Sequence, residues 1–361
     1  MNFGELVVWL YKKLVISIVL ILIATSVIRS ATKPIEVGNS EFPLQQKWSA
    51  KMKDRVVAVS ASENGPIFAR SPYSLNALDA STGKLLWKFL LEGQADSRPA
   101  LSLNEIVYVS DSKYIYALDE NNGKPIWQHE QIRSCKGSAI DLSDSLILFH
   151  NGGGLLSGCS TETGVLLWQT GAPKGNGNDA YINDNNEIVY NLHHGIKAID
   201  AITGNAIWQA DEDGSGFYEN EIIYRTNEFG VNAFNTQSQS YVWLRLMNIS
   251  SPYMTNFVSG KDLFAVSDTN HIYVFQKSNG AIKWKMNFGE TVSRLTTIED
   301  NLFALDRFKQ IVHAFDINTG KDLGELRVSI PVFAAIDYPN FTSTTDALIF
   351  SSGKIVYLYG K

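Results

Sequence analysis

The carboxylates and hydroxyl of the segment DEDGSG, residues 211–216, are the strongest candidates for metal chemistry in this sequence. Asp211, Asp213 and Ser215 have the spacing of oxygen ligands in a calcium-binding loop. Ile222, however, stands where the bidentate Glu of such a loop belongs. A solvated loop explains the segment better, and we predict no metal site there.

Two further groups of residues have types that could bind a metal ion or a phosphate, but their spacing fits neither kind of site. His193 and His194 are adjacent in a tight turn, and neighbouring side chains on a strand point in opposite directions, so they cannot share a metal ion. The glycines of NGGGLL, residues 151–156, are followed by neither Lys nor Ser/Thr, so the segment does not match a phosphate-binding loop. We therefore expect no catalytic residue, no bound cofactor and no metal ion.

The two cysteines, Cys135 and Cys159, lie 24 positions apart. Two are too few for a disulfide framework, and their separation does not match a metal site. Two interpretations stay open: a single disulfide, which an exported protein permits, or two small buried hydrophobic side chains. Asn248 and Asn340 begin NIS and NFT, which are glycosylation acceptors only if the source glycosylates exported chains.

A segment of eleven residues occurs seven times and carries almost no reactive side chains. Its first copy, ALDASTGKLLW, starts at residue 77, and the later copies start at residues 117, 158, 198, 233, 274 and 314. Successive copies therefore lie 40, 41, 40, 35, 41 and 40 residues apart, which is the length of one four-stranded propeller blade. We interpret the repeat as structural, because copies of an active site would point into different clefts.

Each copy has the composition of a β-hairpin turn. In four copies an apolar strand ends in an aspartate that can accept hydrogen bonds from backbone N–H groups further along the turn: Asp79, Asp119, Asp200 and Asp316. Four residues later stands a glycine, where the loop requires a positive φ: Gly83, Gly123, Gly164, Gly204, Gly280 and Gly320. Four residues beyond the glycine position stands a tryptophan, whose indole ring we expect to fill the wedge between neighbouring sheets: Trp87, Trp127, Trp168, Trp208, Trp243 and Trp284.

The elements that position these turns are short strands. Two more strands precede each turn strand, as SRPALS and EIVYVSD precede YIYALD, so each unit contains four strands. Trp48 lies in an outer strand that has no blade before it, whereas VFAAIDYP, DALIFSS and KIVYLYG are three strands with no Trp strand after them. The sequence therefore predicts an all-β fold: an eight-bladed β-propeller of four-stranded antiparallel blades over residues 45–361, its ring closed by the N-terminal strand.

The N-terminal segment differs from the rest in composition. Residues 14–28 carry no charge, with two lysines just before them and Arg29 just after. The run is short for a membrane span, but apolar residues upstream extend it, and its length also suits a signal peptide with a poor cleavage site. We predict one hydrophobic helix in residues 1–33, as membrane anchor or signal segment, and a linker at 34–44. The propeller would be exported and lie on the extracytoplasmic side.

The overall composition excludes one class of partner. The chain is 45% hydrophobic and 19% charged, which is typical of a globular protein. Its formal net charge of −6 gives it no general attraction to nucleic acid, whose phosphates require a concentrated Lys/Arg surface. We therefore expect no nucleic-acid partner.

The form A-L-D-x-x-T-G-x-x-x-W resembles the pyrroloquinoline-quinone (PQQ)-type β-propeller repeat, from Trp48 to the end of the sequence. Members of this family are quinoprotein alcohol dehydrogenases and the non-enzymatic, BamB-like outer-membrane assembly propellers. The enzymes imply a disulfide between adjacent cysteines and a calcium ion held by Glu, Asn and Asp above the quinone, and the separated Cys135 and Cys159 depart from that pattern. BamB-like propellers imply an exported, membrane-tethered module whose loops bind a partner protein, although here no Cys follows the apolar segment to carry a lipid.

The function predicted from these observations is that of a membrane-tethered extracytoplasmic scaffold, or an assembly or sensor module, without catalysis. Its partner would be an unidentified protein, expected in the cell envelope. The alternative function is a PQQ-dependent, dehydrogenase-like enzyme or a propeller that binds a small ligand.

Overall fold

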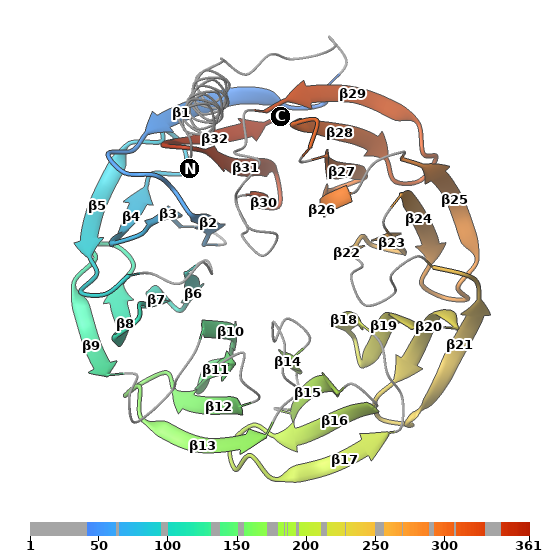
Figure 1. Ribbon diagram of the computed structural model, residues 1–361, viewed down its shortest axis with the longest axis horizontal. Coiled ribbons are helices and arrows are strands. Elements are labelled where there is room, and N and C mark those ends of the chain that lie inside the picture. Colours follow the sequence, from blue (N-terminus) through green and yellow to red (C-terminus); the bar gives the residue numbers. More distant parts are fainter. Residues whose placement is uncertain are drawn as a thin grey trace, which may run out of the picture.

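Every element in the described part of the chain is a β-strand, and the strands form eight four-stranded sheets around a central axis (Figure 1). The computed structural model describes residues 42–62, 65–94, 100–130, 138–150, 155–171, 180–183, 185, 187–192, 195–210, 215–227, 229–249, 256–268, 270–288, 292–306, 308–328 and 341–361. Neighbouring strands of each sheet are antiparallel. The prediction of an all-β, eight-bladed propeller with four-stranded antiparallel blades is confirmed.

The first four blades follow one another along the chain. Blade 1 contains β2 (Ala58–Ala61), β3 (Ile67–Ser71), β4 (Ser74–Leu78) and β5 (Leu85–Leu90). Blade 2 contains β6 (Leu101–Leu103), β7 (Ile106–Ser110), β8 (Tyr114–Asp119) and β9 (Pro125–Glu130). Blade 3 contains β10 (Ser138–Leu142), β11 (Leu146–His150), β12 (Leu155–Ser160) and β13 (Leu166–Gly171). Blade 4 contains β14 (Ala180–Ile182), β15 (Glu187–Leu192), β16 (Gly195–Asp200) and β17 (Ala206–Ala210).

The last blade combines strands from both ends of the propeller. Blade 5 contains β18 (Ser215–Glu219), β19 (Ile222–Asn227), β20 (Gly230–Asn235) and β21 (Ser240–Leu246). Blade 6 contains β22 (Asn256–Ser259), β23 (Leu263–Ser267), β24 (His271–Gln276) and β25 (Ile282–Asn287). Blade 7 contains β26 (Val292–Ile298), β27 (Asn301–Asp306), β28 (Ile311–Asp316) and β29 (Asp322–Arg327). Blade 8 contains β30 (Phe341–Ser343), β31 (Ala347–Ser352), β32 (Ile355–Gly360) and, as its outer strand, β1 (Gln45–Lys51).

A β-bulge recurs in the outer strand of every blade. In blade 1, Ala77 pairs with Trp87 but Leu78 pairs with Leu85, so that the residue before the tryptophan is the extra one. The register shifts at the same place in the other blades. Because a bulge re-aims the side chains beside it, this irregularity helps to direct the tryptophans toward the next blade.

The two ends of the sheets carry different connections. In blade 2, the turns at 104–105 and 120–124 lie at one end, and the turn at 111–113 lies at the other. The first of these ends carries the Asp–Gly turns in every blade that has them, and we call it the turn face. The opposite end is the loop face, where each blade continues into the next.

The hydrophobic core lies between neighbouring blades. Trp48 of blade 8, Val59 of blade 1 and Ile349 of blade 8, for example, belong to one buried cluster. The two middle strands of a blade, such as β3 and β4, are almost fully buried, whereas the outer strand alternates, as the pattern of β5 shows. Each seam between blades is therefore a small core of its own.

Several features of the sequence lie at the edge of the described residues or beyond it. Cys159 is buried and disulfide-bonded, which favours the disulfide interpretation, and Cys135 falls outside the described residues. Asn248 is exposed. Residues 1–41, 151–154, 193–194 and 211–214, together with Asn340, are also outside the described part. Among the residues that the structure describes, no helix is long and apolar enough to cross a membrane.

Candidate functional site

The repeat aspartates are engaged in local hydrogen bonds within their own turns. Asp79 Oδ1 accepts hydrogen bonds from the backbone N–H of Thr82 at 2.7 Å and from the hydroxyls of Ser81 and Thr82, each at 2.7 Å. These bonds, first those of the two hydroxyls, lower the pKa of Asp79 to about 2. Asp200 accepts the equivalent bonds from Thr203, and its pKa is lowered for the same reason. Permanently ionised carboxylates of this kind are poor proton carriers near neutral pH.

Each turn glycine lies against the tryptophan of the preceding blade. The six turn glycines have φ between +67° and +72°, as the turn geometry requires. In addition, a Cβ atom built on Gly204 would lie only 2.7 Å from the Trp168 ring. Glycine is therefore required twice over: for its φ and for the ring that covers it.

The tryptophans also form hydrogen bonds across the seams between blades. In six of them the indole Nε1 donates to the carbonyl oxygen of the residue after the turn Asp position in the next blade, at 2.7–3.0 Å. The pairs are Trp48 with Ala80, Trp87 with Glu120, Trp127 with Thr161, Trp168 with Ala201, Trp243 with Lys277, and Trp284 with Ile317. Trp208 lies near Phe234 of the next blade, with ring centroids 6.5 Å apart. The tryptophan positions therefore link the blades and do not line a common cavity.

A second set of turn-holding residues, on the loop face, was missed by the sequence analysis. Asp111 is 2% exposed, and its Oδ1 accepts hydrogen bonds from the backbone N–H groups of Lys113 and Tyr114. Its Oδ2 accepts from the Gly93 N–H and the Tyr116 hydroxyl, both at 2.8 Å. Asn227, Asp268 and Asp306 accept backbone N–H bonds in the same turn of other blades. In blades 2, 5 and 6 this residue stands eight positions before the turn Asp position, and that spacing was the signal in the sequence.

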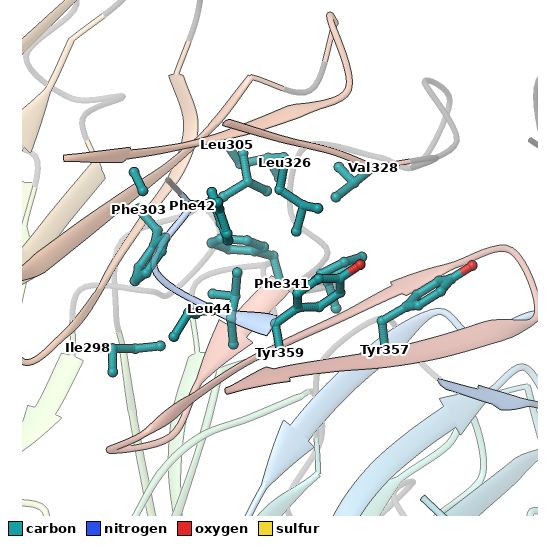
Figure 2. Close-up of a cluster of buried hydrophobic side chains, with 14 residues drawn as sticks. Phe42, Leu44, Ile298, Phe303, Leu305, Leu326, Val328, Phe341, Tyr357 and Tyr359 are labelled. Carbon is teal, nitrogen blue, oxygen red and sulfur yellow. The ribbon is translucent and has the colours of Figure 1, made fainter. Parts of the chain in front are cut away.

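The outer strand of blade 7 has Gly324 where the other blades have tryptophan. The seam between blades 7 and 8 is instead occupied by Phe42 and Leu44, which precede β1 and are 8% and 2% exposed. Figure 2 shows both side chains pointing into a cluster with Phe303 and Tyr359, and the Phe42 and Phe303 ring centroids lie 5.9 Å apart. The sequence showed that a tryptophan was missing here but not which side chains replace it.

Blade 5 carries a run of exposed apolar side chains on the outer rim of the ring. On β21, Val242, Leu244 and Leu246 are 51%, 46% and 73% exposed, and Phe229 in the adjacent loop-face turn is 59% exposed. The backbone joins the two parts, because the Met247 N–H donates to the Phe229 carbonyl at 3.1 Å. We call Val242, Leu244, Leu246 and Phe229 the blade 5 rim.

No other outer strand has three apolar residues at these positions. The positions one before, one after and three after the tryptophan hold Lys283, Lys285 and Asn287 in β25. In β5 they hold Leu86, Lys88 and Leu90. The remaining outer strands have at least one Lys, Gln, Ser, Glu or Arg at the same places.

A buried arginine contacts β21, the strand that carries three residues of the blade 5 rim. Arg225 is fully buried, and its Nε donates to Asn232 Oδ1 at 2.8 Å. Its guanidinium carbon lies 5.3 Å from the centre of the Phe234 ring and 5.9 Å from that of Tyr241 on β21. These cation–π contacts hold the outer strand against the blade. The rim is thus an exposed apolar edge on a rigid element, which suits protein binding and offers no chemistry for catalysis.

The described residues contain no group of three or more His, Cys, Asp or Glu side chains that could hold a metal ion. Of the segment that resembles a calcium loop, only Ser215 and Gly216 are described. Asp211 and Asp213 lie outside the described residues.

Comparison with known proteins gives a consistent family match. The family model described as "Outer membrane protein assembly factor BamB" matches residues 45–286 and 192–359. The protein of that name from Shewanella oneidensis is 21% identical over 303 residues, covering 81% of this chain and 70% of that protein. The one from Moranella endobia is 26% identical over 234 residues, covering 58% of this chain and 59% of that protein.

Solved structures show the same fold at low identity. BamB from Moraxella catarrhalis superposes with a TM-score of 0.69 at 16% identity, covering 88% of this chain and 98% of that one. A europium-containing methanol dehydrogenase superposes with a TM-score of 0.65 at 12% identity, covering 93% of this chain and all of the other. At these identities the likeness concerns the fold alone, and it does not choose between a binding module and an enzyme.

Proposed function

Because this chain belongs to the family of the outer membrane protein assembly factor BamB, we propose that it is a non-catalytic, extracytoplasmic propeller that binds a protein of the envelope assembly machinery. The observation that carries the proposal is the blade 5 rim. Its four apolar side chains are between 46% and 73% exposed, and a contiguous apolar patch on a rigid surface is typical of a protein-binding site.

The position of the rim also indicates how a partner binds. β21 is the outermost strand of its sheet, so its outer edge pairs with no other strand among the described residues. A partner segment in extended conformation can add to such an edge through backbone hydrogen bonds, while alternate side chains give specificity. Leu244 and Leu246, two positions apart, present the apolar side chains for that contact.

A binding measurement with matched variants tests this function. We expect Leu244→Asp and Leu246→Asp to weaken capture of the partner from solubilised envelope membranes by about 30-fold each, which corresponds to about 2 kcal/mol for a central contact. Leu90→Asp is the matched control, because Leu90 occupies the equivalent position of β5 and is 68% exposed. Equal loss in all three variants, or no loss in the first two, would refute the role of the blade 5 rim.

Attachment to a membrane through residues 1–33 is the second part of the proposed function, and the charge-free run 14–28 supports it. We expect the full chain to sediment with lipid vesicles after washing at high salt. Leu20→Arg combined with Leu22→Arg should release it, because each arginine costs about 2.5–3.5 kcal/mol at the centre of a membrane helix. Continued sedimentation of that variant would show that attachment does not depend on the apolar run.

The alternative function is PQQ-dependent oxidation or binding of a small ligand. The structural likeness to a methanol dehydrogenase favours it only at the level of the fold. Against it stand the 24 positions between Cys135 and Cys159 and the engagement of Asp79 and Asp200 in their own turns.

A further inference from the structure

The chain enters the propeller at a defined place and in a defined direction. β1 pairs antiparallel with β32, from Gln45 opposite Gly360 to Lys51 opposite Ile355. The end of β32 lies at the turn face, as does the β26–β27 turn whose Glu299 is paired with Lys361. The residues that lead into β1 therefore arrive from the turn face.

The entering segment is fixed and does not hang freely from the ring. Phe42 and Leu44 are buried between blades 7 and 8, in the place left open by Gly324. The described chain therefore joins the ring at one seam and from one face.

The distance from this seam to the proposed anchor is short. Only residues 34–41 lie between the segment 1–33 and Phe42, and eight residues span at most about 28 Å even when fully extended. The loop face lies about 20 Å beyond the turn face, because the strands of a blade are five or six residues long. If the ring were inverted, the seam would lie about 20 Å from the lipid, and the eight residues would have to be largely extended to reach it. That extension costs chain entropy, so the arrangement with the turn face toward the lipid is favoured.

We infer that the propeller is held with its turn face toward the membrane and its loop face away from it. This inference rests on the membrane attachment proposed above. It places Phe229, in a loop-face turn, and Leu246, at the loop-face end of β21, on the side of the molecule that faces away from the lipid. A partner can then reach the blade 5 rim without competing with the bilayer.

Energy transfer from single labelled sites to the lipid surface tests the orientation. Lys124 and Lys113 are exposed lysines at opposite ends of blade 2, in the turn face and the loop face respectively. Full-length Lys124→Cys and Lys113→Cys proteins are each labelled with a donor and reconstituted in phosphatidylethanolamine–phosphatidylglycerol vesicles with acceptor-labelled headgroups. We expect higher transfer efficiency from position 124 than from position 113.

A lengthened tether supplies the control. Twenty Gly/Ser residues inserted between residues 41 and 42 give a flexible chain with a contour far longer than the ring is thick, so the difference between the two sites should shrink. Equal or reversed transfer in the original chain, or a difference that the insertion leaves unchanged, would overturn the inference. Failure of the full chain to sediment with vesicles would instead refute the attachment itself, and that result is read separately from the transfer.

Discussion

At the level of single residues, the turn glycines and the tryptophans depend on one another across the seams. Gly204 leaves room for the Trp168 ring, and the Trp168 indole donates to the Ala201 carbonyl at 2.7 Å in the same turn. The two conspicuous positions of each repeat therefore act on different seams. The glycine receives the ring of the preceding blade, and the tryptophan of the same copy reaches the following one.

Comparison of Gly204→Ala with Gly353→Ala separates the cost of a positive φ from the cost of a contact with the Trp168 ring. We expect Gly204→Ala to lower the free energy of unfolding by roughly 2–5 kcal/mol, the sum of about 1–2 for a left-handed residue and about 1–3 for overpacking against Trp168. Gly353→Ala is the control, because Gly353 has φ +60° but no atom within 4 Å of a built Cβ, and it should cost only about 1–2 kcal/mol. Chemical denaturation measures both, and equal costs would show that the ring contact is unimportant.

We expect His313 to make the stability of the fold depend on pH. It lies among rings, with its centroid 5.0 Å from that of Phe288 and 6.2 Å from that of Phe315. Burial lowers its pKa below the ordinary value of 6.5, although the nearby Glu325, Asp306 and Asp322 oppose the shift and Lys309 adds to it. Since the unfolded chain then binds the proton more readily, this contribution to stability is complete above pH 6.5 and is lost as the pH falls through the folded-state pKa.

The measurement for His313 is the free energy of unfolding between pH 7 and pH 5. We expect the unsubstituted protein to lose more stability over this range than His313→Phe, which cannot be protonated. Other titrating groups contribute equally to both proteins. Identical pH dependence would mean that His313 does not titrate differently in the folded state.

At the level of elements, the repeated β-bulge and the N-terminal segment decide how blades meet. The bulge occurs in all eight outer strands, including β29, which has no tryptophan, and β1, which belongs to the last blade. It is therefore a property of the blade and not of the tryptophan alone. In blade 7, whose outer strand lacks the tryptophan, Phe42 and Leu44 from outside the repeat fill the seam with blade 8.

Phe42→Ala tests the importance of this segment for closing the ring. We expect a loss of about 3–5 kcal/mol in the free energy of unfolding, the range for truncating a buried Phe. Tyr73→Ala is the control, because Tyr73 is 59% exposed and surface substitutions usually stay within about 0.5 kcal/mol. Similar midpoints of denaturation for the two variants would show that blades 7 and 8 hold together without Phe42.

At the level of the whole molecule, the closed ring buries the faces of its blades, so that binding must occur on the surface of the ring. Each blade covers the faces of its neighbours, and β1 pairs with β32 so that the last sheet is completed by the first strand. What remains available for recognition are the outer strands and the two faces. The apolar blade 5 rim and the entry of the chain at the turn face differentiate a ring that is otherwise nearly symmetric.

We expect the whole protein to show no specific response to a quinone. Adding PQQ and calcium to the folded protein should give no dye-linked oxidation of alcohols and no stoichiometric, calcium-dependent quenching of tryptophan fluorescence. Asp79 and Asp200 are held in their turns, and the two cysteines are not adjacent. Heat-denatured protein is the control for nonspecific adsorption. Saturable binding that requires calcium would favour the enzyme and make Asp211 and Asp213 the first residues to substitute.

The sequence by itself determined the architecture, because a period of about 40 residues, with a turn in each copy and a tryptophan in six of the seven, admits few other folds. It predicted eight blades from Trp48 and the strands near Lys361, although the inner strand of blade 8 is Phe341–Ser343 and VFAAIDYP, residues 332–339, lies outside the described residues. Asp79 and Gly204 lie in turns, where the repeat predicts them. These properties are local: a hairpin is specified by the residues within it. That is why they could be read without coordinates.

Only the tertiary structure decided which residues meet across the seams. That Gly204 lies under Trp168, that Phe42 replaces a missing tryptophan, and that Arg225 braces Tyr241 are contacts between segments distant in sequence or hidden in irregular stretches. The sequence also did not predict that Leu244 and Leu246 are exposed. The residue type of an apolar position in an outer strand does not depend on whether a neighbouring segment covers it. Burial and contact depend on how sheets are placed around the axis, and that placement is a property of the closed ring and not of any one repeat.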